Sequence, residues 1–306
     1  MENRSEVLIY GSGALACLFA YRLARAGCSV SMLDRWQEGI HTIQTHGVRQ
    51  QDVEQPVSVQ AYHSPEYCSN VTLAIVLVKS WQTEQAALDL SACLASEGIA
   101  LTLQNGLGNQ EILASHLGNA RVVTGSTTYG ATMISPGIFR PGGEGVITLA
   151  NSLASAPISS TLRKAGFDLG FTTHLAGLLW AKLIINSAIN PLTALLEVPN
   201  GALLEKSHAW QLVASAVEEA VQVTVARDIP LPFNDPLMEV ETVLQRTAHN
   251  HSSMLQDMRR GAPTEIDAIT GALLKAAREL GLYLPTHETL YHLVKAKIIE
   301  RQLQAN

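Results

Sequence analysis

The chain has 306 residues, of which 47% are hydrophobic and 16% are charged, and its formal net charge is −6 at pH 7. This length and composition predict about two globular domains with a sizeable apolar core. The negative charge argues against a nucleic-acid partner, because phosphate backbones are bound by basic surfaces.

The amino-terminal residues 1–6 are polar and lack the apolar stretch of a signal peptide. The four cysteines, Cys17, Cys28, Cys68 and Cys93, contain no CxxC pair. This spacing argues against metal and disulfide chemistry and favours a reducing compartment. We therefore expect a cytoplasmic protein.

A glycine-rich turn follows the first predicted strand, residues 7–10. It consists of Gly11, Ser12, Gly13, Ala14, Leu15 and Ala16. A helical stretch to residue 26 and a second strand over residues 28–33 come next. In this setting Gly11 permits the tight turn, Gly13 lets the backbone approach a pyrophosphate, and Ala16 allows close helix–strand packing. The pattern predicts a Rossmann dinucleotide-binding domain, with the helix amino terminus facing the phosphates.

The second strand ends in two residues that give opposite indications about the cofactor. Asp34 is an acidic residue of the kind that binds the ribose hydroxyls of NAD, whereas Arg35 could accommodate the 2′-phosphate of NADP. Arg35 could stack on adenine and pair with the phosphate, while Asp34 could repel it. Arg35 could also be an ordinary solvated surface charge.

Three further strands are predicted over residues 71–78, 99–103 and 122–128. Ligands of open α/β sheets bind beyond the carboxyl ends of the strands, which is where Lys79, Gln82 and Asn105 lie in the sequence. Each could instead be a helix cap or a turn residue. Residues 141–145 predict a hairpin loop before a strand at 146–149, and residues 171–174 could form the last strand.

Helical periodicity begins near residue 175. Within the apolar segment 179–191, Lys182, Asn186 and Asn190 recur every fourth residue and therefore share one helix face. Polar groups in so apolar a helix need partners, and a small polar substrate is the simplest. Other side chains or water could also serve. These polar residues and Pro191 argue against a membrane span.

Later helices are predicted over residues 210–227, 265–280 and 287–304, with Asp235 as a cap for another helix. Residues 250–257 form a polar patch that opens a short helix. Glu265 could belong to a site or simply to a helix start, where acidic residues are favourable. His249 and His251 lack the neighbours of a metal site. We expect two domains, residues 1–174 and 175–306, with the active site in the cleft between them.

Several motifs together resemble the ketopantoate reductase (2-dehydropantoate 2-reductase) family. The matching segments are GSGALA at 11–16, KSWQ at 79–82, NGLG at 105–108, LWAKL at 179–183, NSAINPLTA at 186–194, PNG at 199–201, SSMLQD at 252–257 and TEID at 264–267. They run in the family's order over essentially the whole chain. The helical segments are more specific than the glycine motif.

The resemblance implies an α/β Rossmann domain followed by an all-helical domain like the carboxyl-terminal domain of 6-phosphogluconate dehydrogenase. It also implies reduction of 2-dehydropantoate to (R)-pantoate with NADPH, on the route to pantothenate and coenzyme A. No metal, nucleic acid or membrane is expected as a partner. The expected assembly is a monomer or homodimer.

The resemblance further implies roles for individual residues. Lys182 would be the general acid, and Glu265 would orient the substrate hydroxyl or carbonyl. The substrate would be held by Asn105, Asn186, Asn190, Asn250 and Ser253. The cofactor would contact the glycine motif, Arg35, Lys79, Gln82 and Asn105. Asp34 departs from the uncharged residue that would suit NADPH, so NAD remains possible.

Two alternatives stay open at this point. The chain could reduce another branched or hydroxylated 2-oxo acid on the same scaffold. It could also be a nicotinamide-binding redox sensor without catalysis, although a sensor need not keep proton-transfer groups such as Lys182 and Glu265.

Overall fold

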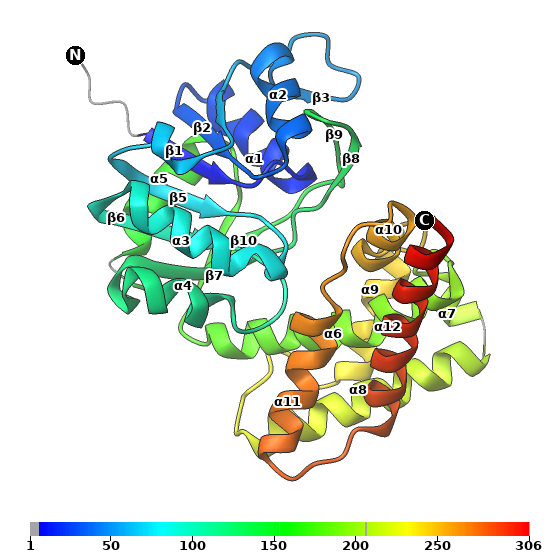
Figure 1. Cartoon of the computed structure of the whole chain (residues 1–306). Coiled ribbons are helices and arrows are strands. Elements are labelled where there is room, and N and C mark those ends of the chain that lie inside the picture. Colours follow the sequence, from blue (N-terminus) through cyan, green and yellow to red (C-terminus); the bar gives the residue numbers. More distant parts are fainter. Residues whose placement is uncertain (1–5, 153, 206, 306) are drawn as a thin grey trace. The chain divides into compact units, whose positions relative to one another are not determined.

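The computed structural model describes residues 6–152, 154–205 and 207–305 (Figure 1). The chain forms two compact units. Unit 1 comprises Met1–Gln104 and Asn109–Leu175, and unit 2 comprises Asn105–Gly108 and Ala176–Asn306. Residues 1–5, most of the polar amino terminus in which no signal peptide was expected, lie outside the described part of the chain.

Unit 1 is built on an eight-stranded sheet in the order β11-β10-β7-β6-β5-β1-β2-β4. Its strands are β1 (Glu6–Tyr10), β2 (Ser29–Leu33), β4 (Gln60–Tyr62), β5 (Val71–Val76), β6 (Leu94–Thr102), β7 (Val122–Thr127), β10 (Ile147–Ala150) and β11 (Leu169–Thr172). All neighbours pair in parallel except β10 with β7. The central order β5-β1-β2 places the start of the chain in the middle of the sheet. The predicted α/β fold of Rossmann type is confirmed.

Both faces of this sheet are covered, as a parallel sheet requires. The helices of unit 1 are α1 (Ala14–Arg25), α2 (Gln37–His46), α3 (Thr83–Cys93), α4 (Asn109–Leu117) and α5 (Ser155–Lys164), with short turns η1 (Pro65–Tyr67), η2 (Ser80–Gln82) and η3 (Asn119–Arg121). Side chains alternate along β1, so Val7 and Ile9 pack in one core with Phe19 of α1. Leu8 and Tyr10 pack in the other core, with Leu90 of α3.

A small second sheet contains β3 (Arg49–Gln50), β9 (Ile138–Pro141) and β8 (Ala131–Ser135), in that order. β8 and β9 form an antiparallel pair around Gly137, whose φ of 74° lies in the left-handed region. The hairpin predicted at residues 141–145 is wrong, because β9 and β10 belong to different sheets. The glycines there let the segment between β9 and β10 lie close to the backbone at Tyr129. A Cβ on Gly145 would be 2.5 Å from the amide nitrogen of Tyr129.

Unit 2 is helical, as predicted. Its helices are α6 (Leu175–Leu196), α7 (Ala202–Glu205), α8 (Ser207–Ala226), α9 (Pro236–Arg246), α10 (Ser253–Arg259), the π-helical turn η4 (Asp267–Gly271), α11 (Ala272–Glu279) and α12 (Pro285–Ala305). Asp235 caps α9 by accepting a hydrogen bond from the amide of Met238, as the sequence indicated. A core of buried aliphatic residues from α6, α8, α9 and α11 joins these helices.

Helix α6 continues through Pro191. By length and composition it is apolar enough to cross a membrane, which corrects the expectation that its polar residues exclude a span. The 18-residue stretch of α6 that meets this criterion has a mean hydropathy of 1.3, but 61% of it is buried inside the protein. That burial is typical of the core helix of a soluble protein.

A buried polar network connects α6, α8 and α12. Glu219 of α8 accepts hydrogen bonds from the amides of Thr286 (2.7 Å) and His287 (3.0 Å) and contacts Nδ1 of His287 at 2.9 Å. The other ring nitrogen of His287 lies 3.2 Å from Oγ of Ser187. Burial raises the pKa of Glu219, but the hydrogen bonds from His287 and Thr286 outweigh it and hold the pKa below its usual value. Glu219 thus serves the otherwise unpaired amides at the start of α12.

We expect Glu219→Gln to lower the free energy of unfolding by ~1–3 kcal/mol at neutral pH, because a buried amide cannot serve all these donors. The difference from wild type should shrink as pH falls below about 4, where the wild-type carboxylate loses its charge and its own contribution. Thermal unfolding followed by circular dichroism measures both effects. The matched control is Glu218→Gln, at the neighbouring exposed position. An unfolding temperature for Glu219→Gln equal to that of the control would contradict the assignment.

Candidate active site

The glycine turn after β1 leads into the start of helix α1 and leaves open space there. Gly11 has a φ of 126°, and a Cβ there would meet Cγ1 of Val78 at 3.2 Å, so glycine is required by the backbone. Gly13 is the N-cap of α1, and a Cβ there would meet nothing within 4 Å. Among the described residues no side chain caps α1 and its first turn has no acidic residue. The open space and the helix amino terminus fit a bound pyrophosphate.

The rest of the glycine motif has packing roles. Ser12 and Ala16 are fully buried, whereas Ala14 and Leu15 at the start of α1 are partly exposed. Ser12 ties the turn to the next strand, because its amide and its hydroxyl both donate to Oδ2 of Asp34, at 2.7 and 2.6 Å. Oδ1 of Asp34 accepts from the amide of Trp36 at 3.1 Å. Asp34 is therefore a nearly buried carboxylate held at the end of β2.

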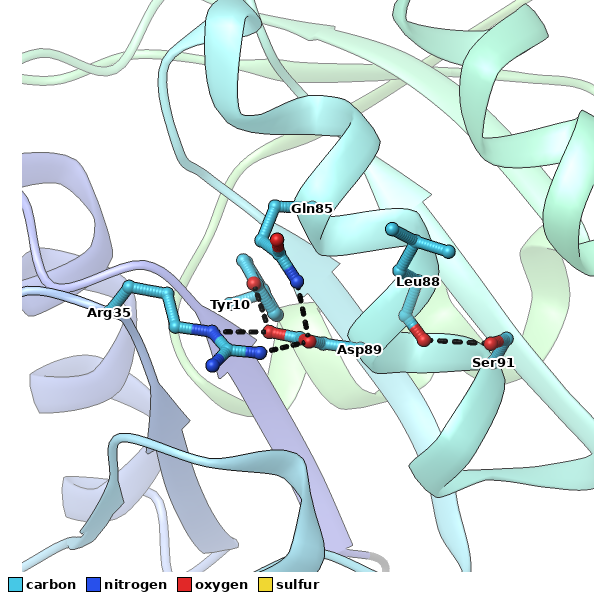
Figure 2. Close-up of polar contacts among 6 residues, drawn as sticks. All are labelled: Tyr10, Arg35, Gln85, Leu88, Asp89 and Ser91. Atoms are coloured by element: carbon cyan, nitrogen blue, oxygen red, sulfur yellow. Dashed lines mark hydrogen bonds and ion pairs between the residues drawn. The ribbon is translucent and has the colours of Figure 1, made fainter.

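Arg35 is engaged in a contact that the sequence did not indicate. Its guanidinium binds the carboxylate of Asp89 on α3 with two hydrogen bonds, as Figure 2 shows. The hydroxyl of Tyr10 and the amide of Gln85 also donate to Asp89. Asp89 is separated from Arg35 by 54 positions. No local pattern could have revealed this pairing.

Lys79 and Gln82 both follow β5 and are partly exposed. Lys79 is the N-cap of η2, and its carbonyl accepts from the amide of Gln82 at 2.9 Å. Gln104, at the end of β6, donates to the carbonyl of Val78 at 3.0 Å and to the hydroxyl of Thr83 at 2.8 Å. These bonds tie together the ends of the two strands that carry the predicted cofactor residues.

The loop Asn105–Gly108 belongs to unit 2 although the chain on both sides belongs to unit 1. The amide of Leu107 donates to the carbonyl of Ala268 in η4 at 3.1 Å. Gly106 has a φ of 81°, and a Cβ there would collide with that same carbonyl. The close approach places Nδ2 of Asn105 3.4 Å from Oε2 of Glu265. The glycine next to Asn105 is thus a requirement for bringing Asn105 to Glu265.

Lys182 and Glu265 form the ionisable centre of unit 2. Glu265 is 5% exposed, and Lys182 is partly exposed on α6. Loss of hydration around the Lys182 ammonium lowers its pKa to about 8, although the negative charge of Glu265 acts to raise it. An amine with this pKa can both donate a proton and stabilise a developing negative charge near neutral pH.

The other predicted substrate residues are positioned by helices and turns. Asn186 and Asn190 continue the face of α6 that begins with Lys182, Asn186 partly exposed and Asn190 buried. Ser253 is the first residue of α10, whose N-cap Ser252 accepts from the hydroxyl of Thr193 at 2.7 Å. This bond fixes the start of α10 against α6.

Asn250 lies in an exposed turn that the Pro-Asn-Gly motif holds in place. The amide of Asn200 donates to the carbonyl of Asn250 at 2.9 Å, and its side chain donates to the hydroxyl of Thr247. A Cβ on Gly201 would meet Cβ of Ala248 at 2.7 Å. The motif therefore has a local structural role next to Asn250.

Within the described ranges, no cluster of three or more His, Cys, Asp or Glu side chains could hold a metal ion. Unit 1 thus brings together the glycine turn, Asp34 and Arg35, and unit 2 brings together Asn105, Lys182 and Glu265. The contacts of Asp89 and Gln104 were not predicted because they depend on tertiary structure.

Known proteins match the chain over nearly its full length. Family models described as "Ketopantoate reductase PanE/ApbA" and "Ketopantoate reductase PanE/ApbA C terminal" match residues 7–153 and 174–298. A 2-dehydropantoate 2-reductase of Halobacterium salinarum is 33% identical, over 95% of this chain and 98% of the relative.

Solved structures give the same picture. A PanE/ApbA family ketopantoate reductase from Ralstonia eutropha has a TM-score of 0.90 and 30% identity, covering 97% of this chain and 99% of that one. A D-mandelate dehydrogenase with NADH and anilino(oxo)acetate also has a TM-score of 0.90, at 25% identity, covering 96% and 98% of the two chains.

We expect Glu265→Gln to lower the pKa of Lys182 further below about 8, because the charge that raises it is removed. NMR titration of protein labelled at lysine Cε measures the shift. Glu239→Gln, at a partly exposed position on α9, is the matched control and should leave the titration unchanged. A Lys182 pKa in Glu265→Gln equal to the wild-type value would show that the two groups do not interact.

Proposed function

The chain belongs to the ketopantoate reductase family, and we propose that it reduces 2-dehydropantoate to (R)-pantoate with a reduced nicotinamide cofactor. It is an oxidoreductase, like the family members that it matches. The observation that carries the proposed reaction is Lys182, an amine with a pKa of about 8 beside the buried Glu265. A structural lysine at a surface would keep its ordinary pKa.

Unit 1 supplies residues that fit the cofactor. The space at Gly13 and the uncapped start of α1 suit the pyrophosphate, and Asp34 lies about 20 residues further on, where a ribose-binding acid is expected. Lys79, Gln82, Arg35 and Asn105 are the further residues that we assign to the cofactor. When bound, the nicotinamide supplies the hydride for the substrate carbonyl.

Reduction of a ketone leaves negative charge on its oxygen. In the proposed mechanism, protonated Lys182 stabilises this charge and transfers its proton to the oxygen. Glu265 accepts from Asn105 and sets the charge balance around Lys182, and we assign it the orientation of the substrate hydroxyl or carbonyl. Only the protonated amine can act as the acid, so the reaction should depend on the titration of Lys182.

The remaining polar residues are assigned to substrate binding. The substrate carries a carboxylate and a hydroxyl, which suit amide and hydroxyl groups. Asn105, Asn186, Asn190, Asn250 and Ser253 supply such groups. Fixed orientation of this kind is worth several kcal/mol to a reaction.

The family resemblance implies NADPH, and we keep NADPH as the proposed cofactor, with NADH as an alternative because of Asp34. We also propose a cofactor-binding domain over residues 1–174 and a substrate domain over residues 175–306. The predicted active site in a cleft between them stays a prediction. The proposed enzyme is cytoplasmic, and a monomer or homodimer.

A second candidate substrate is another 2-oxo acid. The similarity to a D-mandelate dehydrogenase, with the same TM-score as the ketopantoate reductase, favours this candidate. A panel of 2-oxo acids with aliphatic, hydroxylated and aromatic side chains separates the two candidates by their kcat/KM values.

We expect rapid oxidation of NADPH by 2-dehydropantoate, followed by absorbance of the reduced nicotinamide. Lys182→Ala should lower kcat by ~10²–10⁴-fold, the range for loss of a general acid, while nucleotide binding is retained. Lys275→Ala, at an exposed position of α11, is the matched control and should keep full activity. Turnover of Lys182→Ala near the wild-type rate would exclude the assigned role.

The reduction rate should also depend on pH. Because the pKa of Lys182 is lowered to about 8 and the protonated amine is the acid, kcat/KM should fall as pH rises through about 8. Measuring kcat/KM from pH 6 to pH 10 at subsaturating substrate shows whether it falls in this way. A rate that stays constant to pH 10 would mean that the acid has another identity.

A further inference from the structure

The contact between Arg35 and Asp89 bears on which nicotinamide cofactor the protein selects. Nε and Nη2 of Arg35 lie 3.1 and 2.5 Å from the two carboxylate oxygens of Asp89. Two parallel bonds between a guanidinium and a carboxylate form the strongest common ion-pair geometry. These two bonds use Nε and Nη2, so a 2′-phosphate would be left mainly with the Nη1 side of the guanidinium and would share its positive charge with Asp89.

Asp89 cannot easily give up this partner. Its side chain is 4% exposed, whereas that of Arg35 is 49% exposed. Without Arg35 the buried carboxylate would keep, among the described residues, the uncharged donors Tyr10, at 2.7 Å, and Gln85, at 2.9 Å. Only the carboxylate is buried, and removing its charged partner is costly because the buried charge is left uncompensated. Figure 2 shows the donors converging on this carboxylate from β1, α3 and the end of β2.

The surrounding charges support the same conclusion. The hydrogen bond to Asp89 raises the pKa of Arg35, and burial together with Asp89 raises the pKa of Tyr10, so the tyrosine remains a neutral donor. Asp34 precedes Arg35 and carries a second negative charge. Asp89, paired with Arg35, and Asp34, the preceding residue, together disfavour an incoming dianion.

Asp34, in contrast, is suited to a ribose with a free 2′-hydroxyl. A carboxylate has about four acceptor positions, and the amide and hydroxyl of Ser12 and the amide of Trp36 use three. The remaining position lies on a side chain that is already held at the end of β2. Asp34 therefore keeps one acceptor position with which it could bind a ribose hydroxyl.

We propose that Asp89 is a specificity-determining residue: by holding Arg35 it weakens selection for the 2′-phosphate, so that NADH and NADPH are bound with similar affinity. Asp89 is a positioning residue, because it acts on the cofactor through Arg35. This inference rests on the nicotinamide-binding role of unit 1 in the proposed function. It adds a residue that the family motifs and the sequence do not single out.

The test measures nucleotide binding by the full chain without any 2-oxo acid. Fluorescence titration gives the Kd values of NADPH and NADH, and competition with adenosine 2′,5′-bisphosphate and with 5′-AMP isolates the effect of the 2′-phosphate. In the wild type we expect each pair of Kd values to agree within about tenfold. Asp89→Asn should shift both ratios about tenfold toward the 2′-phosphate, with the Kd of NADH unchanged.

Two further variants distinguish an effect of Asp89 on cofactor selection from a purely structural role. Glu84→Gln removes an exposed charge on α3, the helix that carries Asp89. Glu84 pairs with His116 of α4, so this variant should leave the ratios of Kd values unchanged. Adding Arg35→Ala to Asp89→Asn should abolish the gain for NADPH, because the gain passes through the freed guanidinium. If Asp89 only stabilises the fold, Asp89→Asn should change the unfolding temperature and leave both ratios of Kd values unchanged.

Several results would overturn the inference. One is an unchanged ratio in a folded Asp89→Asn protein. Another is a wild-type preference for adenosine 2′,5′-bisphosphate over 5′-AMP above about 100-fold. This second result would contradict the inference even if Asp89→Asn does not fold. Binding of neither nucleotide would overturn the proposed function as well, whereas binding with unchanged ratios would overturn this inference alone.

Discussion

The position of β1 between two parallel neighbours is the constraint on which the rest of unit 1 depends. Because β1 pairs with β2 on one side and β5 on the other, its carboxyl end is the point where three strands finish together. The turn that leaves it must be tight, which Gly11 permits, and the amides of Gly11 and Ser12 bind the carbonyl of Leu33 and the carboxylate of Asp34 at the end of β2. Tyr10, the last residue of β1, reaches Asp89 from the opposite side of the sheet to the glycine-turn helix. The glycine turn and the Arg35 contact are thus consequences of one strand arrangement.

In unit 2 the corresponding constraint is a balance of burial and charge at Lys182. Burial alone would lower the pKa of an amine, and a neighbouring carboxylate alone would raise it. Both act here, and the result is a pKa lowered to about 8. The balance depends on Glu265, whose place is set by the loop at Gly106. A glycine whose φ is positive therefore affects an acid–base group on a different element.

Much of this could be predicted from the sequence, for physical reasons. Buried parallel strands are continuous apolar runs, so the strands around the glycine motif were located to within a few residues. The spacing of Lys182, Asn186 and Asn190 placed them on one face of α6 because a helix repeats every 3.6 residues. The partner of Arg35 could not be found, since an aspartate on an ordinary helix gives no local signal of a contact 54 positions away. The hairpin at residues 141–145 was wrong because glycine content indicates a turn but not which sheet the next strand joins.

The π-helical turn η4 has a consequence for how this protein can change over evolution. It begins two residues after Glu265 and precedes the regular helix α11, whose Leu273 and Ala277 are buried in the core. One extra residue in a regular helix rotates everything beyond it by about 100°. A π turn accommodates the extra residue within one wider turn, so the residues of α11 that face the core keep their positions. The segment that carries Glu265 could therefore gain or lose a residue and re-aim its carboxylate, while the hydrophobic packing behind it stayed the same.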